Sequence, residues 1–274
     1  MKVFFSDLDG TLLNDQKTIG RKTRSALEAF LDAGNAFAVS TGRAMESALA
    51  VQRELHLYYP RTFLIAYNGA QIWDCDRKQT IHRIGVDLNL IDPIFALAQK
   101  HRIHIHTYND THIVTPPVRD AADEECLTFY RRVIKSPLLV TEDITGALPE
   151  PPCKCIAIEL HDADRLERFR MELKDLAGPR LTLLYSNPYY LEIFRAEAGK
   201  GSAVNKLCEY LGIPASSAIA AGDEENDISM IQAAGLGIAM KNGSLRTQAA
   251  ADVVTTEDNN HDGLADFLIR ETDS

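Results

Sequence analysis

Two aspartates near the N-terminus, Asp7 and Asp9, have the residue type and spacing that acid–base and metal chemistry needs. They follow a short apolar run and stand two positions apart, so in extended backbone their side chains share one face. Two converging carboxylates repel each other unless a cation lies between them, and Mg²⁺ takes oxygen ligands. A lone pair of this kind is more often a solvated strand end with a turn, here at Gly10. The pair therefore indicates a metal site only if other segments add ligands.

A second acidic stretch, Gly222–Asp227, can add such ligands. It follows another apolar run and precedes a helical pattern. By itself it is also typical of an acidic helix start, because carboxylates are favourable at the positive end of a helix dipole. If both apolar runs are strands of one sheet, their acids point into the same crevice. We then expect Asp7, Asp9 and Asp223 to share one metal ion.

Two further motifs carry groups that can bind an anion. Thr41-Gly42-Arg43 closes another apolar run, where a hydroxyl and backbone N–H groups can donate, although a plain strand-to-helix turn would look the same. Lys200 begins a helical pattern, a place where the helix dipole disfavours positive charge, so something anionic should offset it. Together with a metal ion, these donors meet the electrostatic demand of phosphoryl transfer to an aspartate nucleophile.

The elements that must position these residues alternate along the chain. Apolar runs at Lys2–Ser6, Ala36–Ser40 and Phe63–Ala66 are separated by helical patterns at Thr23–Ala33 and Ala44–Leu55. The alternation returns near the C-terminus with helices at Ser202–Leu211 and Asp227–Ala234, strands at Ser217–Ala221 and Leu236–Met240, and a last helix near Gly263–Arg270. This rhythm predicts an α/β fold with a doubly wound, Rossmann-like parallel sheet, whose ligands bind beyond the carboxyl ends of the strands.

The middle of the chain has a different pattern, in which strands meet as hairpins around a proline-rich break at Leu148–Pro152. We expect an inserted α+β cap domain at residues 83–189, within a catalytic core formed by residues 1–82 and 190–274. The insert and its return should contain helices at Leu88–Lys100, Ala121–Val133 and Asp164–Leu176 and strands at Ile103–Tyr108, His112–Thr115, Lys154–Leu160, Leu181–Tyr185 and Tyr190–Phe194.

Three histidines in this insert, His101, His104 and His106, suggest a second metal site. His104 and His106 would lie on one face of a strand, with Ile103 and Ile105 on the other. No third ligand has the right spacing nearby. We therefore expect a half-exposed sheet face without a metal.

Composition narrows the class of protein further. With 29 basic and 39 acidic residues among 274, the formal net charge is −10, so a nucleic-acid partner is not expected. No apolar run approaches the roughly 20 residues that span a bilayer, and Asp7 comes too early for a signal peptide. The five cysteines are scattered and odd in number, which favours reduced packing residues. We expect a cytoplasmic protein with no membrane partner, and no protein partner is evident.

Five motifs in a fixed order make the sequence resemble the haloacid dehalogenase-like (HAD) phosphatases, specifically Cof-type members with the large inserted cap of subfamily IIB. The motifs are Asp7–Leu13, Ser40–Arg43, Asn68–Ala70, Lys200–Gly201 and Gly222–Asp227. The similarity extends over essentially the whole chain. It implies that Asp7 is the nucleophile that forms an aspartyl-phosphate, and that Asp9 is the general acid for the leaving group and then the base for water.

The resemblance also implies a set of binding roles. Mg²⁺ would be held by Asp7, by the backbone carbonyl of Asp9 and by Asp223, with Asp227 supporting them from behind. Thr41 and Lys200 would hold the phosphoryl oxygens, and Lys200 would also orient Asp7. The remaining substrate contacts would come from Gly42, Arg43, Asn68, Gly69 and Asn226.

Two segments depart from the family pattern. Glu192–Gly199 lacks the proline and glycine that such proteins often carry before the lysine, and Met240-Lys-Asn-Gly243 replaces the common Met-Gly-Asn-Ala. The loop shape around Lys200 and any substrate contact of Asn242 therefore stay open.

These observations predict a magnesium-dependent phosphatase for a small phosphorylated metabolite, such as a sugar phosphate or cofactor phosphate. A phosphotransferase or phosphomutase is an alternative, because it would pass the same phosphoryl group to a sugar hydroxyl. A non-enzymatic phospho-receiver is another, although it would not need an insert of roughly a hundred residues.

Overall fold

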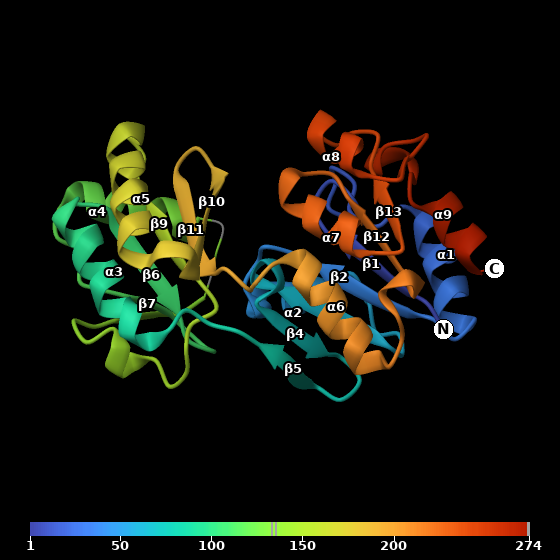
Figure 1. Ribbon diagram of the computed structural model, residues 1–274, viewed down its shortest axis with the longest axis horizontal. Helices are drawn as coiled ribbons and strands as arrows, with labels where there is room; N and C mark the ends of the chain where they lie inside the picture. The colour runs from blue at the N-terminus through green and yellow to red at the C-terminus, as the bar shows by residue number, and fades with distance from the viewer. Residues whose placement is uncertain (133, 135, 273–274) are drawn as a thin grey trace. The chain divides into compact units, whose positions relative to one another are not determined.

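The computed structural model describes residues 1–132, 134 and 136–272 (Figure 1). The chain divides into two compact units. Unit 1 consists of Met1–Arg83 and Ala198–Ser274, and unit 2 of Ile84–Glu197. The chain therefore leaves the first unit once and returns to it, as expected for an inserted domain.

Unit 1 is built on an eight-stranded sheet with the order β14-β13-β12-β1-β2-β3-β4-β5. Its strands are β1 (Val3–Asp7), β2 (Ala36–Ser40), β3 (Thr62–Ala66), β4 (Gln71–Asp74), β5 (Gln79–Arg83), β12 (Ala218–Gly222), β13 (Leu236–Ala239) and β14 (Val253–Val254). All pairs from β14 to β3 are parallel. Every residue of β1, β2, β3 and β12 is buried, as expected for parallel strands that helices cover on both faces.

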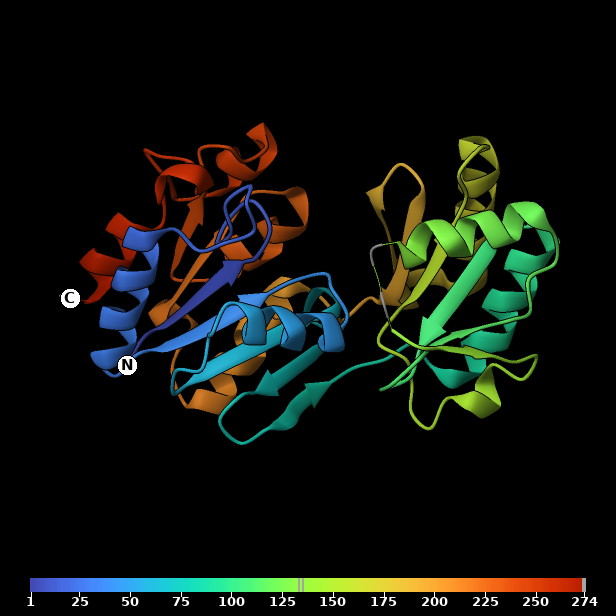
Figure 2. The same ribbon diagram turned by 180° about the vertical axis from the view of Figure 1, so that it is seen from behind.

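Helices pack on both faces of this sheet because alternate strand residues point to opposite sides. On one face, Phe4 of β1 packs edge to face on Phe30 of helix α1. On the other face, Val3 and Phe5 share a core with Val204 of helix α6. The helices of unit 1 are α1 (Arg21–Asp32), α2 (Met45–Glu54), α6 (Lys200–Leu211), α7 (Ile228–Ala233), α8 (Leu245–Ala250) and α9 (Ala265–Thr272). Helices α1 and α9 lie side by side, so the two ends of the chain meet (Figures 1 and 2).

Unit 2 contains a six-stranded sheet with the order β10-β11-β9-β6-β7-β8. Its strands are β6 (His104–Tyr108), β7 (Ile113–Thr115), β8 (Leu138–Val140), β9 (Cys155–Ile158), β10 (Leu181–Asn187) and β11 (Tyr190–Arg195), and its helices are α3 (Leu88–Lys100), α4 (Ala121–Arg131) and α5 (Ala163–Ala177). Phe95 of α3 and Phe169 of α5 share a core with Ile105, so these helices cover one face. Tyr130 of α4 packs on His106 at the other.

The structure corrects several details of the predicted organisation. The strand predicted at Tyr190–Phe194 does complete the insert, because β11 pairs with β10 and β9, but the boundary expected after residue 189 lies too early, since unit 2 continues to Glu197. The pair β4 and β5 extends the parallel sheet with an antiparallel edge that the sequence reading missed, as it missed β8. The predicted end of a helix at Val133 lies outside the described residues.

The expected half-exposed histidine face is also wrong. His104 and His106 are 3% and 0% exposed, because α4 covers this side of β6. A partner for His104 does exist, since Asp123 of α4 lies 2.7 Å from its Nδ1. The residue is 19 positions away in sequence, beyond the reach of a spacing rule.

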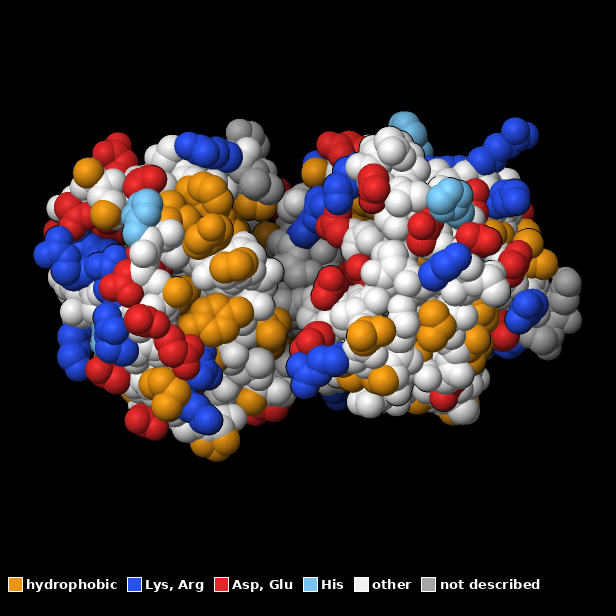
Figure 3. All heavy atoms as spheres, turned by 90° about the horizontal axis from the view of Figure 1, so that it is seen from above, with side chains coloured by type: hydrophobic (Ala, Val, Ile, Leu, Met, Phe, Trp, Pro, Cys, Tyr) orange, Lys and Arg blue, Asp and Glu red, His pale blue; other side chains and the backbone are white. Residues whose placement is uncertain are grey.

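Charged side chains of both signs are interspersed over the face shown in Figure 3, on both units, and the basic ones do not gather into one patch there. Among the helices that the structure describes, none combines the length and the apolar character needed to cross a membrane.

Candidate active site

The site is built at the carboxyl end of β1, where Asp7 is the last strand residue. Parallel pairing sets its neighbours: Asp7 is in register with Ser40 of β2, and Ser6 with Ala221 of β12. Thr41 comes directly after β2, and Asp223 directly after β12. Both residues therefore lie at the same edge of the sheet as Asp7. This is the edge at which doubly wound sheets bind their ligands.

Lys200 is the first residue of α6, and its side chain is fully buried. Its Nζ donates to Asp7 Oδ1 at 2.5 Å, to Asp227 Oδ1 at 2.6 Å and to the Ser40 carbonyl at 3.1 Å. Burial lowers the pKa of this ammonium, but the charges of Asp7 and Asp227 outweigh it and raise the pKa. The anionic partners expected for a lysine at a helix start are thus two carboxylates.

Three buried carboxylates can hold a metal ion: ligand oxygens of Asp7, Asp223 and Asp227 all lie within 4.8 Å of one another. Both oxygens of Asp227 are already in use, because Oδ1 accepts from Lys200 and Oδ2 from the backbone N–H groups of Asp223 and Glu224. By contrast, Oδ2 of Asp7 and Oδ2 of Asp223 receive no hydrogen bond from the described residues. A hard cation such as Mg²⁺ would find two open carboxylate oxygens here.

The electrostatics of this cluster also favour a cation. Burial raises the pKa of Asp7 to about 7; Lys200 opposes this rise, and the charges of Asp227 and Asp223 add to it. Burial likewise raises the pKa of Asp223 to about 6, against the hydrogen bond from Thr11. These carboxyls resist ionisation because one lysine faces three acids in a buried place. A divalent ion would favour their charged forms.

The Asp9 carboxylate is paired with two cations, whereas the metal-type group of carboxylates consists of Asp7, Asp223 and Asp227. Strand β1 ends at Asp7, and the backbone turns through Gly10 at φ +85°, which ends the alternation of side chains. Arg43 donates to both Asp9 oxygens at 2.7 to 3.1 Å, and Lys17 Nζ donates at 2.7 Å. Burial raises the pKa of Asp9, but these hydrogen bonds and the charge of Arg43 lower it overall.

Thr41 and Asn68 form the second wall of the site. The Thr41 N–H donates to the Ile65 carbonyl at 2.8 Å, its carbonyl accepts from the Asn68 N–H at 3.1 Å, and its hydroxyl accepts from the Arg43 N–H at 3.2 Å. Asn68 has φ +54°, a conformation that asparagine tolerates, and lies in the 3-10 turn η1 (Tyr67–Gly69). The loops after β2 and β3 are therefore held together by backbone hydrogen bonds.

The glycine at position 69 is needed for close packing against α6. Its φ is +100°, and a Cβ there would lie 2.1 Å from the Gly199 carbonyl oxygen, just before Lys200. Gly42 also faces Asn68, whose Oδ1 would be 3.0 Å from an added Cβ. Asn226, in η5 (Glu225–Asp227), donates to the same Oδ1 at 3.4 Å. The structure thus brings the expected substrate-contact residues together in unit 1.

Several residues at this site carry contacts that their sequence pattern did not predict. The hydroxyl of Thr11 donates to Asp223 Oδ1 at 2.8 Å, and its place in the motif Asp7–Leu13 was the available signal. Lys17 carried no signal. Asn242 donates to the Gly10 carbonyl at 2.8 Å and accepts from the Asn259 N–H at 3.1 Å, so it ties two loops of unit 1 together.

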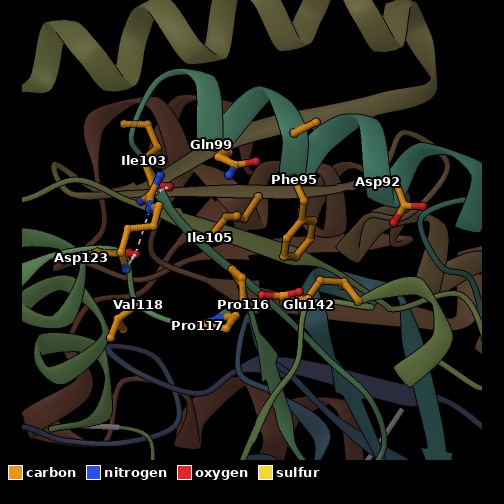
Figure 4. Close-up of a pocket in the computed structure, with 13 residues that line it drawn as sticks. Asp92, Phe95, Gln99, Ile103, Ile105, Pro116, Pro117, Val118, Asp123 and Glu142 are labelled. Atoms are coloured by element: carbon orange, nitrogen blue, oxygen red, sulfur yellow. Dashed lines mark hydrogen bonds and ion pairs between the residues drawn. The ribbon is translucent and has the colours of Figure 1, made fainter.

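Unit 2 contains a cavity of about 670 Å³ between α3 and the loops that follow β7 and β8 (Figure 4). Phe95, Ile105 and Pro116 form much of its wall, and Glu142 points between them. The charge of Asp123 at one end is matched by Arg119, which donates to it at 2.9 Å. The carboxylate and lysine cluster described above belongs entirely to unit 1.

Comparison with known proteins supports the architecture. A sequence profile described as haloacid dehalogenase-like hydrolase matches residues 4–268. The 5-amino-6-(5-phospho-D-ribitylamino)uracil phosphatase YwtE of Bacillus subtilis is 29% identical over 288 residues, which cover 98% of this chain and 97% of that protein.

Two solved structures match over nearly the whole length. A haloacid dehalogenase-like hydrolase from Bacteroides thetaiotaomicron has a TM-score of 0.84 at 28% identity and covers 98% of both chains. TM0651 from Thermotoga maritima has a TM-score of 0.83 at 27% identity and covers 98% of this chain and 97% of its own. These matches confirm the predicted α/β fold class.

Proposed function

We propose that this chain, a member of the haloacid dehalogenase-like hydrolase family and one of its Cof-type phosphatases, hydrolyses phosphomonoesters with Mg²⁺ through an aspartyl-phosphate on Asp7. The motifs of the sequence predicted this family. One observation carries the proposal. The Asp7 carboxylate is buried at the end of β1; one oxygen accepts from Lys200, and the other accepts no hydrogen bond from the described residues. An aspartate so held can attack a phosphorus atom with one carboxylate oxygen while cations hold the other.

The proposed reaction has two steps: the phosphoryl group passes first to Asp7 and then to water. One Asp7 oxygen bonds to phosphorus as the bond from phosphorus to the leaving oxygen breaks, and Asp9 gives that oxygen a proton. Water then attacks phosphorus, passes a proton to Asp9, and the bond between phosphorus and Asp7 breaks. Lys200 would hold Asp7 and, with Thr41, the phosphoryl oxygens, which stabilises charge that develops in the transition state.

The donor set fits a magnesium ion. Asp7 and Asp223 keep open oxygens, and all the available ligands are hard oxygen atoms. With the backbone carbonyl of Asp9 they would hold Mg²⁺, while Asp227 supports Lys200 and the backbone at Asp223. When bound, the ion would neutralise the repulsion between the nucleophile and the anionic substrate.

We propose a small phosphorylated polyol, such as a sugar phosphate, as the substrate. The support is that YwtE, similar over the full length, is named for a substrate with a phosphorylated ribityl chain. In the same proposal unit 1 is the catalytic core and unit 2 the cap domain that chooses the leaving group.

Replacement of the nucleophile tests the mechanism. Asp7→Asn should reduce phosphate release from p-nitrophenyl phosphate at least about 10³-fold, because the amide cannot form the phosphoenzyme. The matched control is Asp32→Asn, an exposed aspartate of α1, which should retain wild-type activity. Acid-quenched wild-type enzyme should carry phosphate that hydroxylamine releases, and the Asp7→Asn enzyme should not. Comparable turnover by Asp7→Asn, or full activity in excess EDTA, would contradict the proposal.

A further inference from the structure

Two cationic side chains from separate segments hold the Asp9 carboxylate. Arg43, after β2, makes three hydrogen bonds to its two oxygens. Lys17 reaches it from the loop that follows β1, at 2.7 Å from Oδ1. Both oxygens of Asp9 are therefore fixed from two directions, and a carboxylate so held has one orientation rather than several.

The loop that carries Lys17 is itself well anchored. Asn14 and Thr18 close it, since the Asn14 N–H donates to the Thr18 carbonyl at 3.0 Å and the Asn14 side chain accepts from the Thr18 N–H at 2.9 Å. The Lys17 N–H donates to the Asn14 carbonyl at 2.9 Å, and Lys17 has φ +59°. The loop is also tied to the C-terminal part of unit 1, because Asp15 N–H donates to Asn260 Oδ1 at 2.9 Å. The lysine thus projects from a defined turn.

The ion pair is not placed to stabilise the fold. The side chains of Lys17 and Asp9 are 63% and 39% exposed, and exposed pairs of this kind contribute little to the free energy of unfolding. Within the described part of the chain, the Lys17 ammonium is bonded to Asp9 and to no other side chain. Its contact with Asp9 is therefore its distinguishing feature.

We propose that Lys17, together with Arg43, is a positioning residue that holds Asp9 for its proton transfers. This inference rests on the proposed function, in which Asp9 protonates the leaving oxygen and then accepts a proton from water. Such transfers require heavy atoms within about 2.6–3.2 Å of each other, so a loss of orientation lowers the rate even when the carboxyl remains. Lys17 acts through Asp9 and does not touch the reacting atoms.

A double-mutant cycle with phenyl phosphate as substrate tests this role. Its leaving group, phenolate, is more basic than nitrophenolate and therefore depends more on protonation by a general acid. Lys17→Met should lower kcat about 10-fold, a part of the 10²–10⁴-fold that general acid–base catalysis supplies, because the lost orientation of Asp9 outweighs the easier protonation that follows when a neighbouring positive charge is removed. In the Asp9→Asn background the same change should alter kcat by less than about 2-fold, because the group it orients is gone. Lys17→Arg should restore most of the activity. Lys22→Met, at an exposed lysine of α1, should have wild-type kinetics.

The outcomes separate this inference from the proposed function. Equal effects of Lys17→Met in both backgrounds, a change confined to KM, or no effect at all would refute the positioning role in an otherwise active enzyme. An effect accompanied by an equal loss of thermal stability that Lys17→Arg does not rescue would refute it too. Wild-type protein that releases no phosphate, or Asp9→Asn protein with wild-type kcat, would refute the proposed function instead.

Discussion

Each unit buries a connected group of polar side chains, and the two groups differ in how completely they are satisfied. In unit 2, Asp123 contacts His104 at 2.7 Å, His104 contacts His106 at 3.3 Å, and His106 contacts the Tyr108 hydroxyl at 3.3 Å. Tyr108 in turn forms a hydrogen bond with Tyr130, which extends this side-chain network. Each ring nitrogen of His104 and His106 has one of these partners, so both nitrogens of each ring are engaged.

Unit 1 buries a surplus of charge instead. One lysine faces three aspartates, and an oxygen of Asp7 and one of Asp223 receive no hydrogen bond from the described residues. A buried polar group that is fully paired stabilises one packing arrangement, whereas a buried charge without its full complement calls for a ligand. In this molecule the surplus of acidic side chains over cations, rather than burial of polar residues as such, distinguishes the unit 1 cluster.

The histidines of unit 2 fit this distinction. Burial, with the charges of His104 and Lys154, holds the pKa of His106 well below its usual range, so this ring is neutral. Asp123 contacts His104, and Arg119 donates to Asp123, so the charge of this carboxylate is paired. We therefore interpret this hydrogen-bond network as structural, because it holds α4 against β6.

The largest expected effect lies in unit 1. Lys200→Met should lower kcat about 10³-fold, because a buried cation that holds both nucleophile and phosphoryl group is lost. The matched control, Lys206→Met, lies on the same helix but is half exposed, and should leave kcat unchanged. Steady-state kinetics with p-nitrophenyl phosphate and Mg²⁺ measure both. A fall of less than about 10-fold would make the unit 1 cluster structural and would break the comparison.

The reverse pattern is expected in unit 2. His106→Phe should destabilise unit 2 by about 2–4 kcal/mol, because buried groups of His104 and Tyr108 lose a partner, while kcat falls little. Hydrogen exchange of α4 and β6 would show the loss locally, with His161→Phe, at an exposed ring, as control. If kcat fell as far as in Lys200→Met with exchange unchanged, the chain would belong to the catalytic machinery.

The last prediction concerns the pH dependence of stability. Because burial raises the pKa of Asp7 to about 7 from 3.8, folded protein keeps a proton that the unfolded chain has lost between these values. The contribution of Asp7 to stability should therefore fall as pH rises from about 4 to 7 without metal. Urea unfolding in EDTA should show wild type losing stability relative to Asp7→Asn over this range, and Mg²⁺ should reverse the trend. A difference that is constant with pH would contradict the surplus of buried charge.

Much of the fold could be predicted from the sequence because alternation is a local property. The strand Ala36–Ser40 and the helix Leu88–Lys100 were predicted to the residue, since periodic apolar residues and flanking polar residues mark their ends. The antiparallel pair β4 and β5 was missed because Gln79–Arg83 is a half-exposed edge strand with no apolar alternation. The second boundary of the insert was misplaced because β11 pairs with β9, a strand distant in sequence, and such pairing is not visible in the local pattern.

By itself, the sequence determined the order of elements, the residue types at the strand ends and the family, because these depend on neighbours along the chain. Only the tertiary structure decided which of those residues face one another. Asp7 and Lys200 meet although 193 positions separate them, and Asp9 turns to Arg43 and Lys17 rather than to Asp7. The physical reason is that a single turn after a strand redirects a side chain, while the packing of distant helices and loops determines the partner that it finds.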